Sequence, residues 1–255
     1  MRAFVFAGAL ILSACASHSV DPQAAAARQA EALRRADLRL QLASAYFAEG
    51  QYATALQELE QAGQTGERRA DVLGLRALVL MQQGDTAAAG KNLRKALQED
   101  PANPGLLNNM GWLLCETGRR DEGMTYFARA LANKTYQSPA KAMINAGRCS
   151  LQAGKPAQAE TFFRQAVAID PALVSAHASL AKIAYEAGDY AGAKTHLLRV
   201  LASEQAVRED FLMAISIERK LGDKLAEQSL AQQWRKRFPD AAGAVSTSIG
   251  DADER

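Results

Sequence analysis

Six glycines recur along the chain at a nearly constant spacing, and this period constrains the fold more than any other feature of the sequence. The spacings are 34, 34, 36, 34 and 34 residues, for Gly50, Gly84, Gly118, Gly154, Gly188 and Gly222. Each glycine lies between two stretches that have the apolar periodicity of an α-helix. A fixed period of this length is typical of proteins built from stacked copies of one small structural unit.

The positions at a fixed distance from each glycine form columns of small and large side chains. Five residues after the first five glycines the residue is Ala or Gly, and nine residues after them it is Leu or Phe. Seven residues before the same five glycines a second Ala or Gly occurs. Small residues let two helices approach closely, and the prolines Pro101, Pro171 and Pro239 end the second helix of their units. The repeating unit is therefore a pair of packed helices.

These columns resemble the tetratricopeptide repeat over about residues 36–240. The resemblance implies an all-α fold, a superhelical solenoid of about six helix–turn–helix repeats. The composition agrees, because 48% hydrophobic but only 6% aromatic residues and few alternating Val, Ile or Thr runs indicate a nearly all-helical chain. Glu227 and Ala231 break the small and large columns in the last repeat, as expected of a terminal capping unit. The two extra residues before Gly154 are expected in a longer loop within residues 133–141.

The beginning of the chain has the anatomy of an export signal. Arg2 precedes an apolar run that ends at Leu12 and is too short to span a bilayer. The quartet Leu12-Ser13-Ala14-Cys15 resembles the lipobox of bacterial lipoproteins, which implies that residues 1–14 are removed and that Cys15 is acylated. The alternative is an ordinary secretory signal with an incidental cysteine.

A lipid anchor at Cys15 divides the rest of the chain into three parts. Residues 15–35 are expected to form the lipid tether and the start of the first helix, residues 36–240 the six repeats, and residues 241–255 a disordered tail. Ala16 stands where an Asp would resemble the inner-membrane retention signal of such lipoproteins. We therefore expect the protein at the periplasmic face of the outer membrane, attached to the membrane by lipid.

Nothing in the sequence indicates catalysis or nucleic-acid binding. Removing Arg2 from the 30 basic residues leaves 29 against 28 acidic ones, without a basic block, so nucleic acid is not an expected partner. His18, His177 and His196 lack the spacing that a metal site needs. The chain has no nucleophile elbow and no phosphate-cradling glycine loop. We predict a protein that is not an enzyme and that has no cofactor, metal or small-molecule substrate.

Stacked helix pairs offer a concave groove lined by the first helix of each repeat. Its lining is expected from residues ten, six and three before each glycine. The predicted partner-binding groove contains Leu40, Phe47, Leu78, Met81, Asn108, Trp112, Arg148, Lys182 and Tyr185. The residues Leu40, Phe47, Leu78, Met81 and Trp112 suit a docked apolar peptide or strand, unless an N-terminal helix or neighbouring repeats cover them. The amide groups of Asn108, Asn109 and Asn145 are suited either to clamp a ligand backbone or to bond neighbouring helices.

Two cysteines fall on the first helices of adjacent repeats, Cys115 three residues and Cys149 five residues before the repeat glycine. Packed helices have axes about 8 to 10 Å apart, which lets inward-pointing side chains reach the Cα separation of roughly 4.4 to 6.8 Å that a disulfide requires. The expected compartment is oxidising, so we predict a Cys115–Cys149 disulfide. The alternative is a pair of buried free thiols.

Several stretches are more particular than the repeat columns and resemble the PilW/PilF family of type IV pilus lipoproteins. They are NNMGWLLCETGRRDEGMTYFARALANKTYQSPAKAMINAGRC at residues 108–149, FFRQAV, LAKIAYEAGDYAGAKTHLLRVL and IERKLGDKLAEQSLAQQWRKRFP. The W-x-L-C motif, the Tyr-x-x-Pro loop and the I-E-x-x-L-G-D stretch carry the resemblance. Met110 departs from it, because an aromatic residue is expected there in many relatives.

The resemblance implies a pilotin. Such a protein is an outer-membrane lipoprotein that binds the secretin, the ring-shaped pore of the type IV pilus, and promotes its outer-membrane localisation and multimerisation for pilus biogenesis and stability. A monomer is expected. Two alternatives share the same fold: a periplasmic lipoprotein scaffold for cell-wall hydrolases or proteases, and an accessory lipoprotein of β-barrel assembly.

Overall fold

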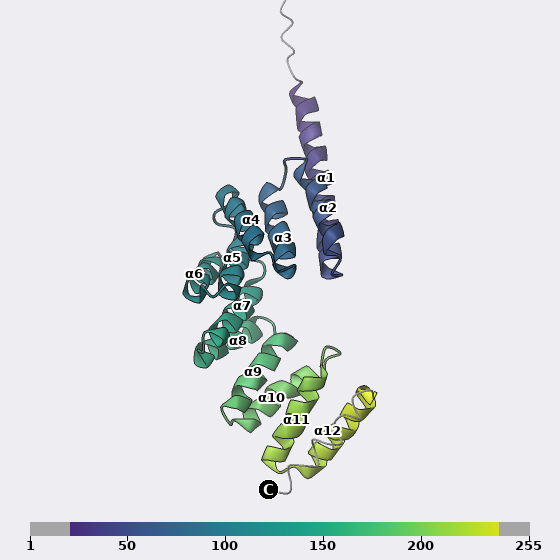
Figure 1. Cartoon of the computed structure of the whole chain (residues 1–255), viewed down its shortest axis with the longest axis vertical. Coiled ribbons are helices and arrows are strands. Elements are labelled where there is room, and N and C mark those ends of the chain that lie inside the picture. Colours follow the sequence, from purple (N-terminus) through teal and green to yellow (C-terminus); the bar gives the residue numbers. More distant parts are fainter. Residues whose placement is uncertain (1–20, 240–255) are drawn as a thin grey trace, which may run out of the picture. The chain divides into compact units, whose positions relative to one another are not determined.

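The computed structural model describes residues 21–239, which form twelve α-helices and no strand (Figure 1). The helices are α1 Pro22–Ala48, α2 Tyr52–Gly63, α3 Arg69–Gln82, α4 Thr86–Glu99, α5 Pro104–Glu116, α6 Arg120–Ala132, α7 Pro139–Gln152, α8 Pro156–Ile169, α9 Val174–Glu186, α10 Tyr190–Leu201, α11 Arg208–Leu221 and α12 Lys224–Arg237. Each odd-numbered helix is followed by a periodic glycine and then by its partner helix. The predicted all-α fold of paired helices is confirmed. Cys15 and the proposed signal and tail segments lie outside the described residues.

The period of 34 residues follows from the turn between the two helices of a pair. All six repeat glycines have a positive φ, between 70° and 83°. This left-handed conformation strains residues that carry a Cβ, and it closes the helix before the turn. The residue after the glycine then starts the second helix. In three repeats this residue is Asp85, Asp189 or Asp223, whose carboxylate accepts a bond from a backbone N–H of the first helical turn.

Small residues allow the two helices of a pair to approach closely. A Cβ built on Gly123 of α6 would lie 2.7 Å from the backbone oxygen of Gly111 on α5. The ring of Phe127 covers Gly111 from the same side, and a Cβ on Gly111 would lie 2.8 Å from that ring. Phe163 of α8 covers Gly147 of α7 in the same way, at 2.7 Å. The small and large columns of the sequence are therefore the two sides of one interhelical contact.

The chain divides into two compact units, one up to Val72 and one from Leu73. In the first unit, α1 packs on α2 through Ala43, Ala55 and Leu59, which are fully buried. In the second unit, each helix from α4 to α12 contacts the next, and α5 also contacts α7. Residues 133–138 join α6 to α7, two more than the four residues that join α4 to α5 or α8 to α9. The extra residues before Gly154 thus lie in this loop, as predicted.

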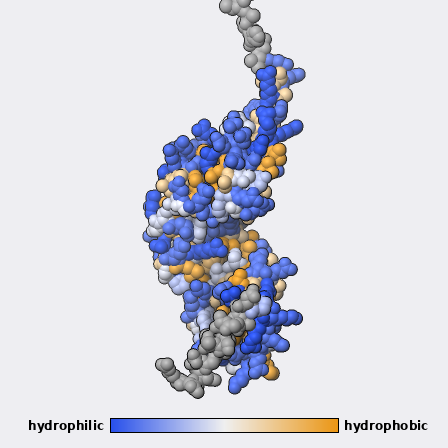
Figure 2. Space-filling view, turned by 45° about the vertical axis from the view of Figure 1, so that its right-hand side comes forward, coloured by the Kyte–Doolittle hydropathy of each residue, from blue (hydrophilic) through white to orange (hydrophobic). Residues whose placement is uncertain are grey.

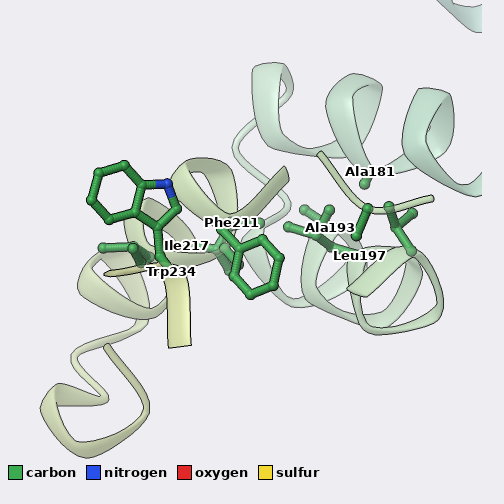
Figure 3. Packing of buried hydrophobic residues seen from close by; sticks show 10 residues of the cluster. Ala181, Ala193, Leu197, Phe211, Ile217 and Trp234 are labelled. Atoms are coloured by element: carbon green, nitrogen blue, oxygen red, sulfur yellow. The ribbon is translucent and has the colours of Figure 1, made fainter. Parts of the chain in front are cut away.

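The last repeat closes its core with one large side chain. Trp234 of α12 is 2% exposed and belongs to the buried cluster of Phe211 and Ile217 on α11 (Figure 3). Leu197 of α10 belongs to the same cluster. The indole fills space that the missing small and large pair of this repeat leaves open. None of the described helices is long and apolar enough to cross a membrane.

Substitution of Gly123 by Ala tests the contact between paired helices. The added Cβ would meet a backbone oxygen, which cannot move aside as a flexible side chain can, so Gly123→Ala should destabilise the fold by about 1 to 3 kcal/mol. Thermal unfolding followed by circular dichroism measures the effect. Gly63→Ala is the matched control, because the nearest atom to its Cβ is 3.9 Å away. A Gly123→Ala melting temperature equal to that of the control would contradict the prediction.

Candidate partner-binding surface

The residues of the predicted groove lie on the first helices of the repeats. They are Leu40 and Phe47 on α1, Leu78 and Met81 on α3, Asn108 and Trp112 on α5, Arg148 on α7, and Lys182 and Tyr185 on α9. All except Asn108 are half-buried or exposed. Figure 2 shows one face of the molecule, on which apolar patches alternate with hydrophilic residues. The first unit contains the two α1 residues and the second unit contains the other seven.

In the first unit, an open cavity of about 600 Å³ lies beside Leu40. Its charged wall is formed by Arg68, whose Nε donates to Asp37 Oδ1 at 2.9 Å and whose Nη1 lies 3.7 Å from Asp71. The hydrogen bond to Asp37 is the main cause that raises the pKa of Arg68. Phe47 contacts the ring of Tyr52 of α2, with centroids 6.0 Å apart. This surface of the first unit combines the apolar side chains of Leu40 and Phe47 with the paired charges around Arg68.

Asn108 was predicted to line the groove, but the structure buries its side chain. It is 1% exposed, and its side-chain oxygen accepts a 3.0 Å bond from Asn145 Nδ2 of α7. Its own Nδ2 donates to Asn109 Oδ1 at 3.3 Å. Because a buried amide is costly without partners, these bonds fix Asn108 between α5 and α7 and leave it no contact with a ligand. Of the two roles left open for the asparagines, the structure shows the bond between neighbouring helices.

Trp112 lies over a covalent link between two repeats. Cys115 of α5 and Cys149 of α7 form a disulfide with a Cα–Cα distance of 5.7 Å. The two cysteines form a buried cluster with Phe127 and Ala146, and Trp112 packs against it. The sequence left a choice between a disulfide and two free thiols, and the structure contains the disulfide. The first helices of the third and fourth repeats are therefore locked together beneath the predicted groove.

Tyr185 is held in place by a neighbouring repeat. Its hydroxyl lies 2.7 Å from Ser216 Oγ of α11, and its ring meets the ring of Tyr190 edge-on at 5.6 Å. Lys182 lies 3.9 Å from Glu186, one turn further along α9. Tyr185 thus offers a pre-oriented aromatic face, whereas Lys182 remains largely exposed.

The structure brings together two histidines that the sequence placed in separate helices. Nδ1 of His177 lies 3.1 Å from Nδ1 of His196, and Nε2 of His177 lies 3.0 Å from the carbonyl oxygen of Pro171. The carbonyl accepts from Nε2–H, so His177 Nδ1 accepts from His196 Nδ1–H. Burial is the main cause that lowers the pKa of His196. No group of three or more His, Cys, Asp or Glu within residues 21–239 is placed to hold a metal ion.

Comparison with known proteins gives the family. Models of the tetratricopeptide repeat match residues 40–104, 80–146 and 150–214, which is more than half of the chain. The chain belongs to the tetratricopeptide-repeat family. Stacked tetratricopeptide repeats present extended surfaces for binding, which agrees with a partner surface on the first helices.

More specific similarities point to pilus proteins. The chain is 25% identical over 203 residues to the type IV pilus assembly protein PilF of Pseudomonas aeruginosa, covering 80% of this chain and 81% of that protein. The crystal structure of PilW, a type IV pilus biogenesis factor, has 28% identity, covers 80% of this chain and 94% of its own, and has a TM-score of 0.70. A solved structure of Pseudomonas aeruginosa PilF has 25% identity, covers 83% and 94% respectively, and has a TM-score of 0.72. The resemblance to the PilW/PilF family is confirmed.

Removal of the disulfide should weaken the second unit. The link spans 34 residues of sequence, and constraining a loop of that length in the unfolded chain stabilises a protein by about 3 to 4 kcal/mol. Cys149→Ala should therefore lower the melting temperature, and wild-type protein in reductant should melt close to the variant. Mass spectrometry after alkylation of protein purified without reductant checks the bond itself. Labelling of both thiols without reductant would show that the bond is absent.

Proposed function

We propose that this chain is a type IV pilus biogenesis protein that acts as a pilotin. In this proposal Cys15 is acylated, the protein is anchored at the periplasmic face of the outer membrane, and its repeats bind the secretin of the type IV pilus. Binding promotes secretin localisation and multimerisation. The similarity to PilF and PilW over 80% of the chain supports this proposal most strongly.

An anchor and a binding surface on one molecule suit this task physically. Acyl chains contribute about 0.8 kcal/mol per buried methylene, so several chains hold a protein at a membrane stably. A partner captured by the repeats is then concentrated at that membrane. Helix α1 starts at Pro22, capped by Asp21, and its first buried residue is Ala36. The fourteen residues from Pro22 to Arg35 span about 21 Å of helix, enough to hold the repeats clear of the lipid headgroups.

The partner surface of the proposal is made of two apolar strips on first helices, Leu40 with Phe47 in the first unit and Leu78 with Met81 in the second. Leu40, Phe47, Leu78 and Met81 are all half-buried, so each keeps apolar area that a docked segment can cover. An extended segment or amphipathic helix of the secretin with apolar side chains fits this chemistry. The cluster around Arg68 borders Leu40 and supplies polar contacts at the edge of the first strip.

Charge introduced into the strips should prevent secretin assembly without unfolding the protein. Leu78→Glu and Phe47→Glu each place a carboxylate where an apolar partner is proposed to dock, so secretin multimers in the outer membrane should fall several-fold on immunoblots. Leu198→Glu is the matched control, because Leu198 is a 56% exposed leucine on α10, a second helix. If the variants are folded and secretin multimers stay at normal levels, the secretin docks on a different surface of the protein. A collapse of the variants' melting temperature would show that these residues are core.

The anchor has its own test at Cys15. Cys15→Ser should leave the protein soluble in the periplasm and displace the secretin from the outer membrane, as membrane fractionation will report. Ala16→Asp is the companion variant, because it keeps the lipid and creates the inner-membrane retention signal, so protein and secretin should move to the inner membrane. Continued outer-membrane fractionation of Cys15→Ser would refute the anchor.

Deletion of the whole chain separates the proposal from proteins of the same fold with other tasks. Loss of secretin multimers in cells with an intact envelope supports the pilotin. Leaky or misshapen cells with normal secretin multimers would support a scaffold for cell-wall hydrolases or proteases, or an accessory of β-barrel assembly.

A further inference from the structure

A second concave feature lies between the second helices of two adjacent repeats and the first helix that separates them in sequence. It is a half-open hollow of about 390 Å³ between α4, α5 and α6, all within the second unit. Its floor is apolar, formed by Met110, Leu113 and Leu114 of α5, which are 4 to 5% exposed. Tyr126 of α6 forms part of its wall. A volume of this size is within the range of pockets that accept ligands or anchoring side chains.

Gly90 lines the hollow and lets the side chains of Leu113 and Arg94 come close to the backbone of α4. Gly90 stands six residues after its repeat glycine, in the interior of α4, where glycine costs about 1 kcal/mol relative to alanine. The other five repeats carry longer residues in this column: Leu56, Met124, Glu160, Lys194 and Gln228. A Cβ at Gly90 would lie 3.3 Å from Leu113 Cδ2 and 3.2 Å from Arg94 Nη1. A longer side chain there would fill the hollow.

The rim of the hollow carries an unbalanced positive charge. Within the described residues, Arg94 makes no hydrogen bond or ion pair, and its guanidinium lies beside Gly90 at the rim. On the other rim, Arg119 Nε donates to Glu122 Oε1 at 2.8 Å, and this bond lowers the pKa of Glu122. Arg119 occupies the position at which three other repeats have a capping Asp, and α6 has no side-chain cap. Because Arg119 neutralises Glu122, the charge of Arg94 remains uncompensated.

We propose that this hollow docks an acidic and apolar segment of a protein. One large apolar side chain of that segment enters the hollow over Leu113, and a neighbouring Asp or Glu carboxylate pairs with Arg94. Buried anchors in pockets commonly dominate the energy of protein recognition, and a bidentate guanidinium–carboxylate pair adds orientation. The site does not depend on the proposed pilus function, because none of the residues that line it belongs to the predicted groove.

To test the proposal, peptides that bind the purified full-length protein are selected from a phage-displayed random library. Peptides selected for this site should carry Leu, Ile, Met, Phe or Trp within two residues of Asp or Glu. Their affinities are then measured by fluorescence anisotropy on variants. Arg94→Glu reverses the rim charge and should weaken binding about tenfold or more, which is the cost of one charge-assisted contact. Gly90→Leu places a bulky side chain in the hollow and should weaken binding by a similar factor.

Two controls make the result specific to the hollow. Lys95→Glu makes the same charge change on the exposed neighbouring residue of α4, and Ala128→Leu adds the same side chain at an exposed position of α6, so both should bind like wild type. A peptide with Lys in place of its acidic residue should bind Arg94→Glu better than wild type, which keeps the test valid if Gly90→Leu unfolds. The proposal is overturned if no selected peptide distinguishes Arg94→Glu from Lys95→Glu. Selected peptides without an acidic residue that Gly90→Leu weakens and Arg94→Glu leaves unchanged would also overturn it.

Discussion

The contact between an aromatic ring and a glycine on the paired helix is the interaction on which the middle of this structure depends. Phe127 covers Gly111 and Phe163 covers Gly147, and each ring is at most 1% exposed. The contact fixes how closely the two helices of a pair lie and which faces of the first helix remain for a partner. A substituted glycine would separate the helices, and the residues proposed to bind the partner would lose their register.

Most of the fold was predictable because it rests on local requirements that repeat. A positive φ at each turn demands glycine, and close helix pairs demand a small residue opposite a large one. Details that depend on residues far apart in sequence were not predictable. Asn108 shares its helix face with groove residues. Only the structure shows that it is buried and bonded to Asn145 of the next repeat. The hollow beside Gly90 is lined by residues of three helices, and only their packing shows that its floor is apolar.

The disulfide and the two proposed surfaces together suggest how the second unit works. Cys115 and Cys149 join α5 to α7, and Trp112 packs on that junction. A rigid junction lets a docked partner meet a pre-formed surface, which lowers the entropy lost on binding. The hollow lies between α4, α5 and α6 and uses charge as well as apolar area. The two proposed surfaces therefore suit segments of different chemistry.

Amide hydrogen exchange on the full-length chain tests most directly the claim that this locked junction organises the second unit. Exchange is followed by mass spectrometry with and without reductant. We predict that α5 and α7 exchange slowly as one block in oxidised protein and markedly faster after reduction, while α9 and α10, which contain no cysteine, keep their rates. Equal exchange of α5 and α7 in both states would contradict the account, because the ring and glycine contacts alone would then hold the junction.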